Sequence, residues 1–447
     1  MPLLRESPAL PHTFPVTAEF TNWRSEQRAW RDTVALLDQS HHMTDLFVQG
    51  PGALAVLSRL GVNRFDGFVP GRAKQFVAVS EEGFLVGDAI LFHLDDGRFD
   101  LVGHPMALDW VQFHLETGGD EVRFERDDNS AIRRHGPPAL YRYELQGPAA
   151  LSLVERLVGG ALGDVPFFHT ARLTVAGRPV SALRHGMAGQ PGFELFGPWA
   201  DGEAVLEAIL EAGGDLGLVR AGAKAYSTAN LESGWVPAPL PAIFTGAGLA
   251  SYRSWLPAAA AGSLGGSFGS ARIEDYYCSP YDLGYGRTVH LDHEFVGRDA
   301  LAAMGGSSGR RKVTLVWHPD DVTALLGSLF EDGLPAKYLE LPKARYALYQ
   351  ADEVRHGGRR VGMSMDCGYV ANEHAFLSLA TVDEDLAVPG TEVEVRWGEE
   401  PNSTKPQVEP HRQVAVRATV AEAPYVAVAR GAYRTATIAE LRRAGGS

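Results

Sequence analysis

The sequence is poor in cysteine and in positive charge, and it lacks any long apolar run. Two cysteines, Cys278 and Cys367, are too few for a disulfide framework and lack the spacing of a metal site. A formal net charge of −14 leaves no basic surface for a nucleic-acid partner. No stretch approaches the ~20 apolar residues of a membrane span, and no signal peptide is evident. We therefore expect a cytoplasmic protein that binds neither membrane nor nucleic acid.

An internal echo organises the first two thirds of the chain. Residues 47–60 read FVQGPGALAVLSRL and residues 144–157 read ELQGPAALSLVERL, with a weaker third copy at 295–304. Each copy predicts the end of a strand, a glycine turn and then a helix with proline in its first turn. The shared Q-G-P-x-A-L favours duplication over coincidence. The spacing is too long for a solenoid, so we expect two similar α+β lobes.

Periodicity assigns further elements. Helices are expected at residues 19–37, 106–117 and 203–213, and strands at residues 74–79, 84–94, 99–103 and 172–177. After about residue 306 the sequence turns to short β-rich runs such as KVTLVW, FLSLATV and TEVEVRW. The fold class is therefore predicted to be α+β. Residues 1–306 would form the two lobes, and residues 307–447 a C-terminal β-barrel domain.

Two stretches hold isolated polar residues. Adjacent histidines in a strand point to opposite faces, so His41 and His42 cannot chelate one metal together, and no other metal motif is present. His42 either reaches a cavity as a proton carrier or is a satisfied structural histidine. Asp88 lies in the otherwise apolar run FLVGDAILF, where an unpaired acid is expensive to bury. It is therefore either hydrogen-bonded structurally or directed at a polar ligand.

The stretch RHGMAGQPGFELFGP at residues 184–198 is the most specific. Its first three glycines are spaced by three residues and allow close backbone approach, and Glu194 then emerges in a short apolar strand. Such an acid suits a partner with adjacent N–H donors, for example an aminopyrimidinone ring. The alternative is a glycine-rich hairpin with a surface glutamate. The following run LESGWVPAPLPAIFTG at 231–246 is a rigid, nearly uncharged shelf of prolines.

R-x-G-x-x-G-x-x-G-x-E at 184–194 and LESG at 231–234 resemble segments of the aminomethyltransferase (glycine-cleavage T-protein) family. NWRSEQRAW, DQSHHM, LESGW and VEPH are similar to its tetrahydrofolate-dependent aryl O-demethylases. The resemblance implies a three-domain cloverleaf with folate in a central opening, in agreement with two lobes and a barrel. It also implies a tetrahydrofolate-dependent enzyme that orients an aryl ether against the folate N5, with no protein nucleophile.

The resemblance assigns roles residue by residue. It implies that folate is bound by Glu194, Glu144, Met187 and Val102. The substrate side would be formed by Phe14, His104, Phe244 and Gln39. The catalytic residues would be His42 and Asp88. We expect His42 to carry the proton for the leaving phenolate and Asp88 to act electrostatically or to position folate.

Three substrate-side positions depart from the demethylase pattern. His104 stands where an arginine would pair with an aromatic carboxylate, and Phe244 and Phe14 stand where tyrosines are expected. These changes predict a neutral aryl ether. A methylenedioxyphenyl lignan such as sesamin would give a catechol and 5,10-methylene-tetrahydrofolate. The alternatives are a vanillate- or syringate-type O-demethylase giving 5-methyl-tetrahydrofolate, and a non-catalytic folate-binding regulatory protein. The sequence does not predict the oligomeric state.

Overall fold

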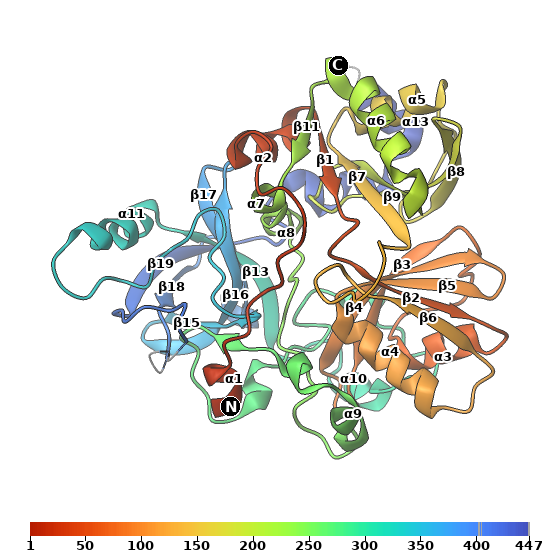
Figure 1. Ribbon diagram of the computed structural model, residues 1–447. Coiled ribbons are helices and arrows are strands. Elements are labelled where there is room, and N and C mark those ends of the chain that lie inside the picture. Colours follow the sequence, from red (N-terminus) through yellow and green to blue (C-terminus); the bar gives the residue numbers. More distant parts are fainter. Residues whose placement is uncertain (401–402, 404, 446–447) are drawn as a thin grey trace.

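The computed structural model describes residues 1–400, 403 and 405–445. Its strands form a five-stranded sheet, a six-stranded sheet and a closed six-stranded barrel, with one additional two-stranded pair. The three parts lie around the N-terminal segment, which runs from α1 (Pro2–Glu6) through the middle of the molecule to α2 (Trp23–Asp32) (Figure 1). No helix within the described residues is both long enough and apolar enough to cross a bilayer.

The first lobe is the five-stranded antiparallel sheet, in the order β3-β4-β5-β2-β6, with its helices packed on one face. The strands are β2 (Thr44–Gln49), β3 (Ala73–Val79), β4 (Leu85–Asp95), β5 (Arg98–Gly103) and β6 (Arg123–Asp127). The helices are α3 (Ala53–Leu60), α4 (Pro105–Thr117), α9 (Ala250–Trp255) and α10 (Arg298–Ala303). A core of aliphatic and aromatic side chains joins sheet to helices, and burying each such side chain contributes roughly 1.5–3 kcal/mol.

The second lobe is the six-stranded sheet, in the order β11-β1-β7-β10-β9-β8. Its strands are β1 (Val34–Asp38), β7 (Leu140–Gln146), β8 (Thr170–Val175), β9 (Arg178–His185), β10 (Gly192–Pro198) and β11 (Leu218–Ala221). The helices beside it are α5 (Ala150–Val158), α6 (Gly202–Gly213), α7 (Ala223–Tyr226) and α8 (Ala229–Ser233). The tail of the chain, with α12 (Ala432–Thr435) and α13 (Ile438–Gly445), returns to this lobe, where α13 contacts α5.

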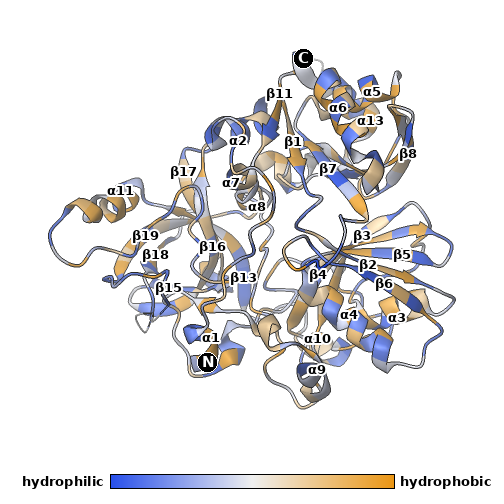
Figure 2. Ribbon diagram, viewed as in Figure 1, coloured by the Kyte–Doolittle hydropathy of each residue, from blue (hydrophilic) through white to orange (hydrophobic). Residues whose placement is uncertain are grey.

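The barrel is closed by β13-β17-β16-β15-β18-β19. These strands are β13 (Arg310–Trp317), β15 (Asp352–His356), β16 (Arg359–Val370), β17 (Ala375–Asp383), β18 (Glu392–Trp397) and β19 (Val414–Ala421), and α11 (Pro319–Gly327) lies outside them. The short strands β12 (Leu264–Gly265) and β14 (Tyr349–Gln350) pair beside it. Hydrophobic and hydrophilic residues mix along the elements of all three parts (Figure 2), as expected where one face is buried.

The predicted α+β fold with two lobes and a C-terminal barrel is confirmed. The helix expected at residues 19–37 forms only over α2, from Trp23 to Asp32, and its last residues are wrong because β1 begins at Val34. The four apolar residues 34–37 are all buried between the edge strand β11 and β7 of the second sheet, and tertiary packing overrides the helical spacing. The third copy of the echo provides a helix, α10, with no strand before it.

Candidate active site

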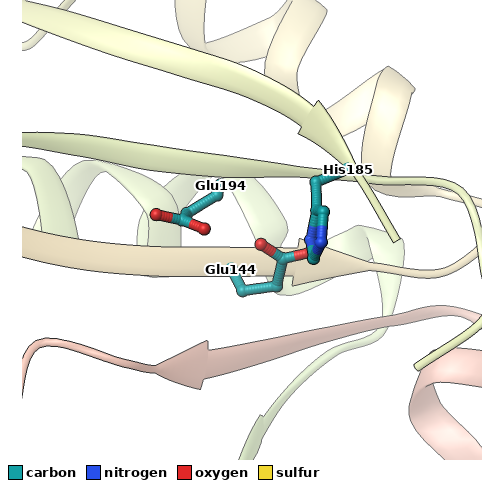
Figure 3. Close-up of side chains that lie close together, drawn as sticks. All are labelled: Glu144, His185 and Glu194. Atoms are coloured by element: carbon teal, nitrogen blue, oxygen red, sulfur yellow. The ribbon is translucent and has the colours of Figure 1, made fainter. Parts of the chain in front are cut away.

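Two carboxylates and a histidine meet on neighbouring strands of the second lobe. Glu144 on β7 lies directly opposite Glu194 on β10, and His185 ends the next strand, β9. One ligand atom from each residue lies within 4.8 Å of the others. The Glu144 carboxylate meets the His185 ring, and Glu194 lies beside them (Figure 3). We call these three residues the carboxylate cluster. Like charges placed opposite each other destabilise a sheet, so the arrangement needs compensating donors.

Glu144 is the more buried acid of the carboxylate cluster. Its Oε1 accepts a hydrogen bond of 2.6 Å from Gln146 Nε2 and lies 3.4 Å from His185 Nδ1. Its Oε2 is buried and has no partner among the described residues. Burial raises the pKa of Glu144, and His185 and the backbone N–H of Met187 partly oppose this rise. Burial lowers the pKa of His185, but Glu144 outweighs it, so that the histidine pKa is raised. An unsatisfied buried acceptor is a place where a ligand N–H would bind.

Glycines shape the turn that carries the second acid. Gly189 has φ +74°, and a Cβ there would lie 2.6 Å from the Ala429 side chain. A Cβ on Gly192 would lie 1.9 Å from Gln146 Nε2, the donor to Glu144. The glycines at 189 and 192 therefore allow two neighbours to pack directly on this backbone: the C-terminal segment at Ala429, and Gln146 beside the carboxylate cluster. Glu194, two residues after Gly192, is buried and not on an exposed hairpin.

A buried arginine neutralises Glu194 and connects the two lobes. Arg142 donates from Nη1 to Glu194 at 2.7 Å, and from Nη2 to Asp100 at 2.9 Å and to Asp45. The two aspartates belong to the first lobe, on β5 and β2. Burial lowers the pKa of the arginine, but the three acids outweigh it and hold the guanidinium charged. Its guanidinium also lies 5.0 Å from the centre of the Phe196 ring.

Four further predicted residues form pairs at this end of the molecule. Gln39 Nε2 lies 3.3 Å from the Met187 sulfur, so these two side chains are in contact. His42 and His41 lie in a turn after β1, not in the expected strand. The ring of His42 packs 5.9 Å from that of Phe14, and its Nε2 is hydrogen-bonded to the Tyr226 hydroxyl. Burial, with the nearby charge of Arg142, lowers the pKa of His42 to about 4, so the ring is neutral at pH 7.

The proline shelf lines a second site, which we call the proline-lined cavity. Residues from β4, the start of α4 and the shelf surround it; among them are Gly87, Asp88, His104, Pro237, Pro239 and Tyr349. At about 30 Å³ it has room for a water molecule or a methyl group, and not for a whole arene. Asp88 Oδ2 accepts hydrogen bonds from Trp235 Nε1 at 2.9 Å, from Tyr285 OH at 2.8 Å and from Gln75 Nε2. Burial raises the pKa of Asp88 despite these donors.

The N-terminal segment bridges the two sites. The ring of His12 lies 6.5 Å from that of Phe14, which contacts His42. His104 precedes α4 at the edge of the cavity. Although His104 keeps an exposed face, desolvation of its ring and then the charges of Arg345 and His12 lower its pKa. His12 therefore lies within electrostatic range of His104 at the edge of the cavity, and Phe14 lies against His42.

The two remaining predicted residues have mainly packing roles. Phe244 packs between two hydrophobic clusters, and its backbone N–H donates to the Tyr277 hydroxyl at 3.2 Å. Val102 is buried beside Leu183 and Phe196, where the two lobes touch. Neither residue places a polar group at the carboxylate cluster or in the proline-lined cavity.

Sequence reasoning missed several functional candidates. Arg142 lies in the run YRYELQ, which carries no motif, and its partners are far away in the chain. Arg345 was not considered either, although it lies only four residues before the cavity residue Tyr349. Tyr285 lies in a loop far from Asp88 in the chain, and Trp235 belongs to the proline shelf, whose composition gives no sign of a hydrogen bond to that acid.

A family model, the GCVT N-terminal domain, matches residues 8–238. Syringate O-demethylase of Sphingobium sp. (strain SYK-6) is 46% identical over 436 residues, which cover 96% of this chain and 94% of that protein. Sesamin methylene transferase of Sinomonas sp. (strain No.22) is 29% identical over 439 residues, covering 92% and 90%. Both relatives therefore match nearly end to end.

A solved structure shares the fold. The glycine cleavage system aminomethyltransferase T from Bartonella henselae superposes with a TM-score of 0.61 at 18% identity. The match covers 93% of this chain and 91% of that one. It includes both lobes and the barrel, in agreement with the cloverleaf expected from the sequence.

Proposed function

This chain belongs to the aminomethyltransferase family defined by the GCVT N-terminal domain, and we propose that it removes the methyl group of a methoxylated aromatic acid. It is a tetrahydrofolate-dependent one-carbon transferase acting on aryl ethers. The methyl acceptor is N5 of tetrahydrofolate, which supplies the nucleophile when it is bound. The protein's own tasks are then to hold the two partners, to exclude water and to protonate the leaving oxygen.

The observation that carries this proposal is the unpartnered carboxylate oxygen of Glu144 beside Glu194. A pterin ring presents adjacent N–H donors, and Glu144 Oε2 is a buried acceptor without a donor among the described residues. Glu194 uses Oε1 for Arg142, which leaves its other oxygen for a ligand. Charge-assisted hydrogen bonds of this kind are worth roughly 1.5–3 kcal/mol each. The carboxylate cluster has the composition of a small metal site as well. However, its two acids already accept hydrogen bonds from Arg142 and Gln146, which suits a pterin better than a metal ion, and we predict no metal.

We propose that Asp88 is the general acid, with the ether group in the proline-lined cavity. A phenolate leaving group has a pKa near ~10 and needs a donor where water is excluded. His42, the donor expected from the sequence, is neutral at pH 7 and already bonded to Tyr226. Asp88 borders the cavity, and burial raises its pKa. We assign His42 instead to the shape and hydrogen bonding of the wall that Phe14 shares.

Methyl transfer from an aromatic acid is favoured over methylene transfer from a neutral lignan. Identity is 46% to the syringate O-demethylase and 29% to the sesamin methylene transferase. The loss of an arginine at position 104 argued for a neutral substrate. However, Arg345 is close enough to His104 to lower its pKa, and its guanidinium forms no hydrogen bond or ion pair within the described residues. We propose that Arg345 supplies the cation for the substrate carboxylate from a different element.

The test pairs a charged substrate with its neutral ester. Syringate and methyl syringate, each incubated with tetrahydrofolate, should both yield 5-methyl-tetrahydrofolate by mass spectrometry, with syringate used at lower KM. Arg345→Leu should raise the KM for syringate about 10–100-fold, the loss of a charge-assisted pair, and leave methyl syringate nearly unchanged. Sesamin serves as the probe for methylene transfer. Equal use of acid and ester by the wild type, or 5,10-methylene-tetrahydrofolate from sesamin as the main product, would contradict the proposal.

Location and assembly are proposals of the same kind. Cys278 and Cys367 are both free and buried, which suits a reducing compartment and a cytoplasmic enzyme. The active-site groups described above all come from one chain, so the proposed chemistry needs no second copy. Size-exclusion chromatography with light scattering would determine the oligomeric state.

A further inference from the structure

Asp88 is bound asymmetrically. All three of its hydrogen bonds, from Trp235, Tyr285 and Gln75, end on the same oxygen, Oδ2. The donors come from three separate segments: β3, the shelf that follows α8, and the loop around residue 285. An oxygen that accepts three donors has no lone pair left for a further partner.

The other oxygen of Asp88 is free. Oδ1 accepts nothing from residues 1–400, 403 or 405–445, and it is not among the buried unpartnered atoms. Asp88 borders the proline-lined cavity, so Oδ1 is the oxygen that is open to it. When the acid is protonated, its proton must be on Oδ1, because a proton on Oδ2 would face three donors. The hydrogen bonds therefore determine which oxygen of Asp88 can act.

We propose that Tyr285, together with Trp235, is a positioning residue that locks Asp88 so that Oδ1 delivers the proton to the leaving ether oxygen. This inference rests on the proposed demethylation. As the methyl–oxygen bond breaks, its electron pair stays on the oxygen, which takes the proton from Oδ1 and becomes a phenol. Asp88 is left as a carboxylate. Replacing the N–H at N5 by N–CH₃ would release one proton. That proton can reprotonate Asp88, so the atoms balance without a further reactant.

The charged and titratable groups around Asp88 determine in which direction its pKa moves when a hydrogen-bond donor is removed. Lys312 on β13 faces it and donates to the Gly234 carbonyl at 2.7 Å, Tyr285 donates to it directly, and His104 borders the same cavity. Burial raises the pKa of Asp88, whereas the three donors and Lys312 oppose that rise. Removing one donor destabilises the carboxylate and raises the pKa further.

The experiment follows kcat against pH for wild type and Tyr285→Phe with syringate. Activity requires protonated Asp88, so it is lost as pH rises through the pKa of that acid. In Tyr285→Phe this alkaline limb should move up by about one pH unit, the effect of one hydrogen bond. The maximal kcat should fall about tenfold through lost alignment, with KM nearly unchanged. Tyr281→Phe is the matched control, since Tyr281 lies in the same loop but donates to the Leu301 carbonyl.

A second readout does not depend on turnover. In protein labelled with 5-fluorotryptophan, the ¹⁹F resonance of Trp235, assigned by its loss in Trp235→Phe, should titrate with Asp88. Its midpoint should rise in Tyr285→Phe, stay in place in Tyr281→Phe and vanish in Asp88→Asn. A midpoint and an alkaline limb that Tyr285→Phe leaves unmoved, or that Tyr281→Phe moves equally, would overturn the inference. A wild type that demethylates no arene but shows the midpoint shift would instead overturn the proposed function and retain the locked Asp88.

Discussion

Replacing Glu194 by glutamine tests the folate assignment at a single charge. Glu194 Oε1 accepts from Arg142 Nη1 at 2.7 Å, and the residue is 6% exposed. Glutamine keeps the shape of the side chain and an oxygen for the arginine. It removes the negative charge that would meet the N–H donors of the pterin. The substitution therefore separates ligand binding from the packing of the second lobe.

The magnitude follows from the change in bond type. A hydrogen bond to a charged acceptor contributes roughly 1.5–3 kcal/mol and a neutral one roughly 0.5–1.5 kcal/mol. The loss on Glu194→Gln is therefore about 1–1.5 kcal/mol, which corresponds to an increase in Kd of about tenfold. Glu144 remains as a second acceptor, so binding should weaken and not vanish.

Isothermal titration calorimetry with tetrahydrofolate under argon measures this change directly. Asp45→Asn is the matched control, because Asp45 pairs with the same arginine from the opposite lobe. It should lower thermal stability as Glu194→Gln does, but change the Kd by less than about threefold. The reasoning is refuted if Glu194→Gln binds folate as tightly as the wild type, or if both variants weaken binding equally.

Two further predictions concern stability. Arg142→Met leaves the buried acids Asp45, Asp100 and Glu194 without their cation. The free energy of unfolding in urea should therefore fall by about 3–5 kcal/mol. A loss below about 1 kcal/mol, or a loss at pH 5 as large as that at pH 8, would contradict this prediction. Burial lowers the pKa of His42 to about 4 in the folded protein. Between pH about 6.5 and 4 the unfolded chain therefore binds one more proton at His42 than the folded protein does, so that stability decreases as the pH falls through this range. His42→Asn should thus be about 1–2 kcal/mol more stable relative to wild type at pH 5 than at pH 8, allowing for partial exposure of the ring; an equal difference at both pH values would exclude the assigned shift.

The sequence predicted local chemistry better than long-range pairing. Glu194 could be singled out because the three glycines that precede it indicate a tight turn, and a Cβ on the last of them, Gly192, would clash with Gln146. The C-terminal barrel was predicted because alternation within short strands is a local signal. The strand β1 was missed because residues 34–37 are buried by β7 and β11, which are far away in the chain.

Pairings across the chain could not be read from the sequence for a physical reason. Tyr285 donates to Asp88 across 197 positions, and Arg142 pairs with Asp45 across 97. Neither partner carries a motif that points to the other, because the energy of a buried ion pair depends on three-dimensional geometry and not on spacing.

Arg345 shows how this affects the assignment of a substrate. In the sequence, His104 stands where the demethylase pattern has an arginine, and this single position predicts an uncharged pocket. In the folded chain the start of α4 lies near the segment that leads into β14, and a cation from that segment acts on His104. A substrate carboxylate needs a positive charge at one position in space, and side chains from more than one strand or loop can provide it. The substitution at 104 therefore does not exclude a carboxylated arene, because Arg345, which we propose as the partner of the substrate carboxylate, could provide the cation.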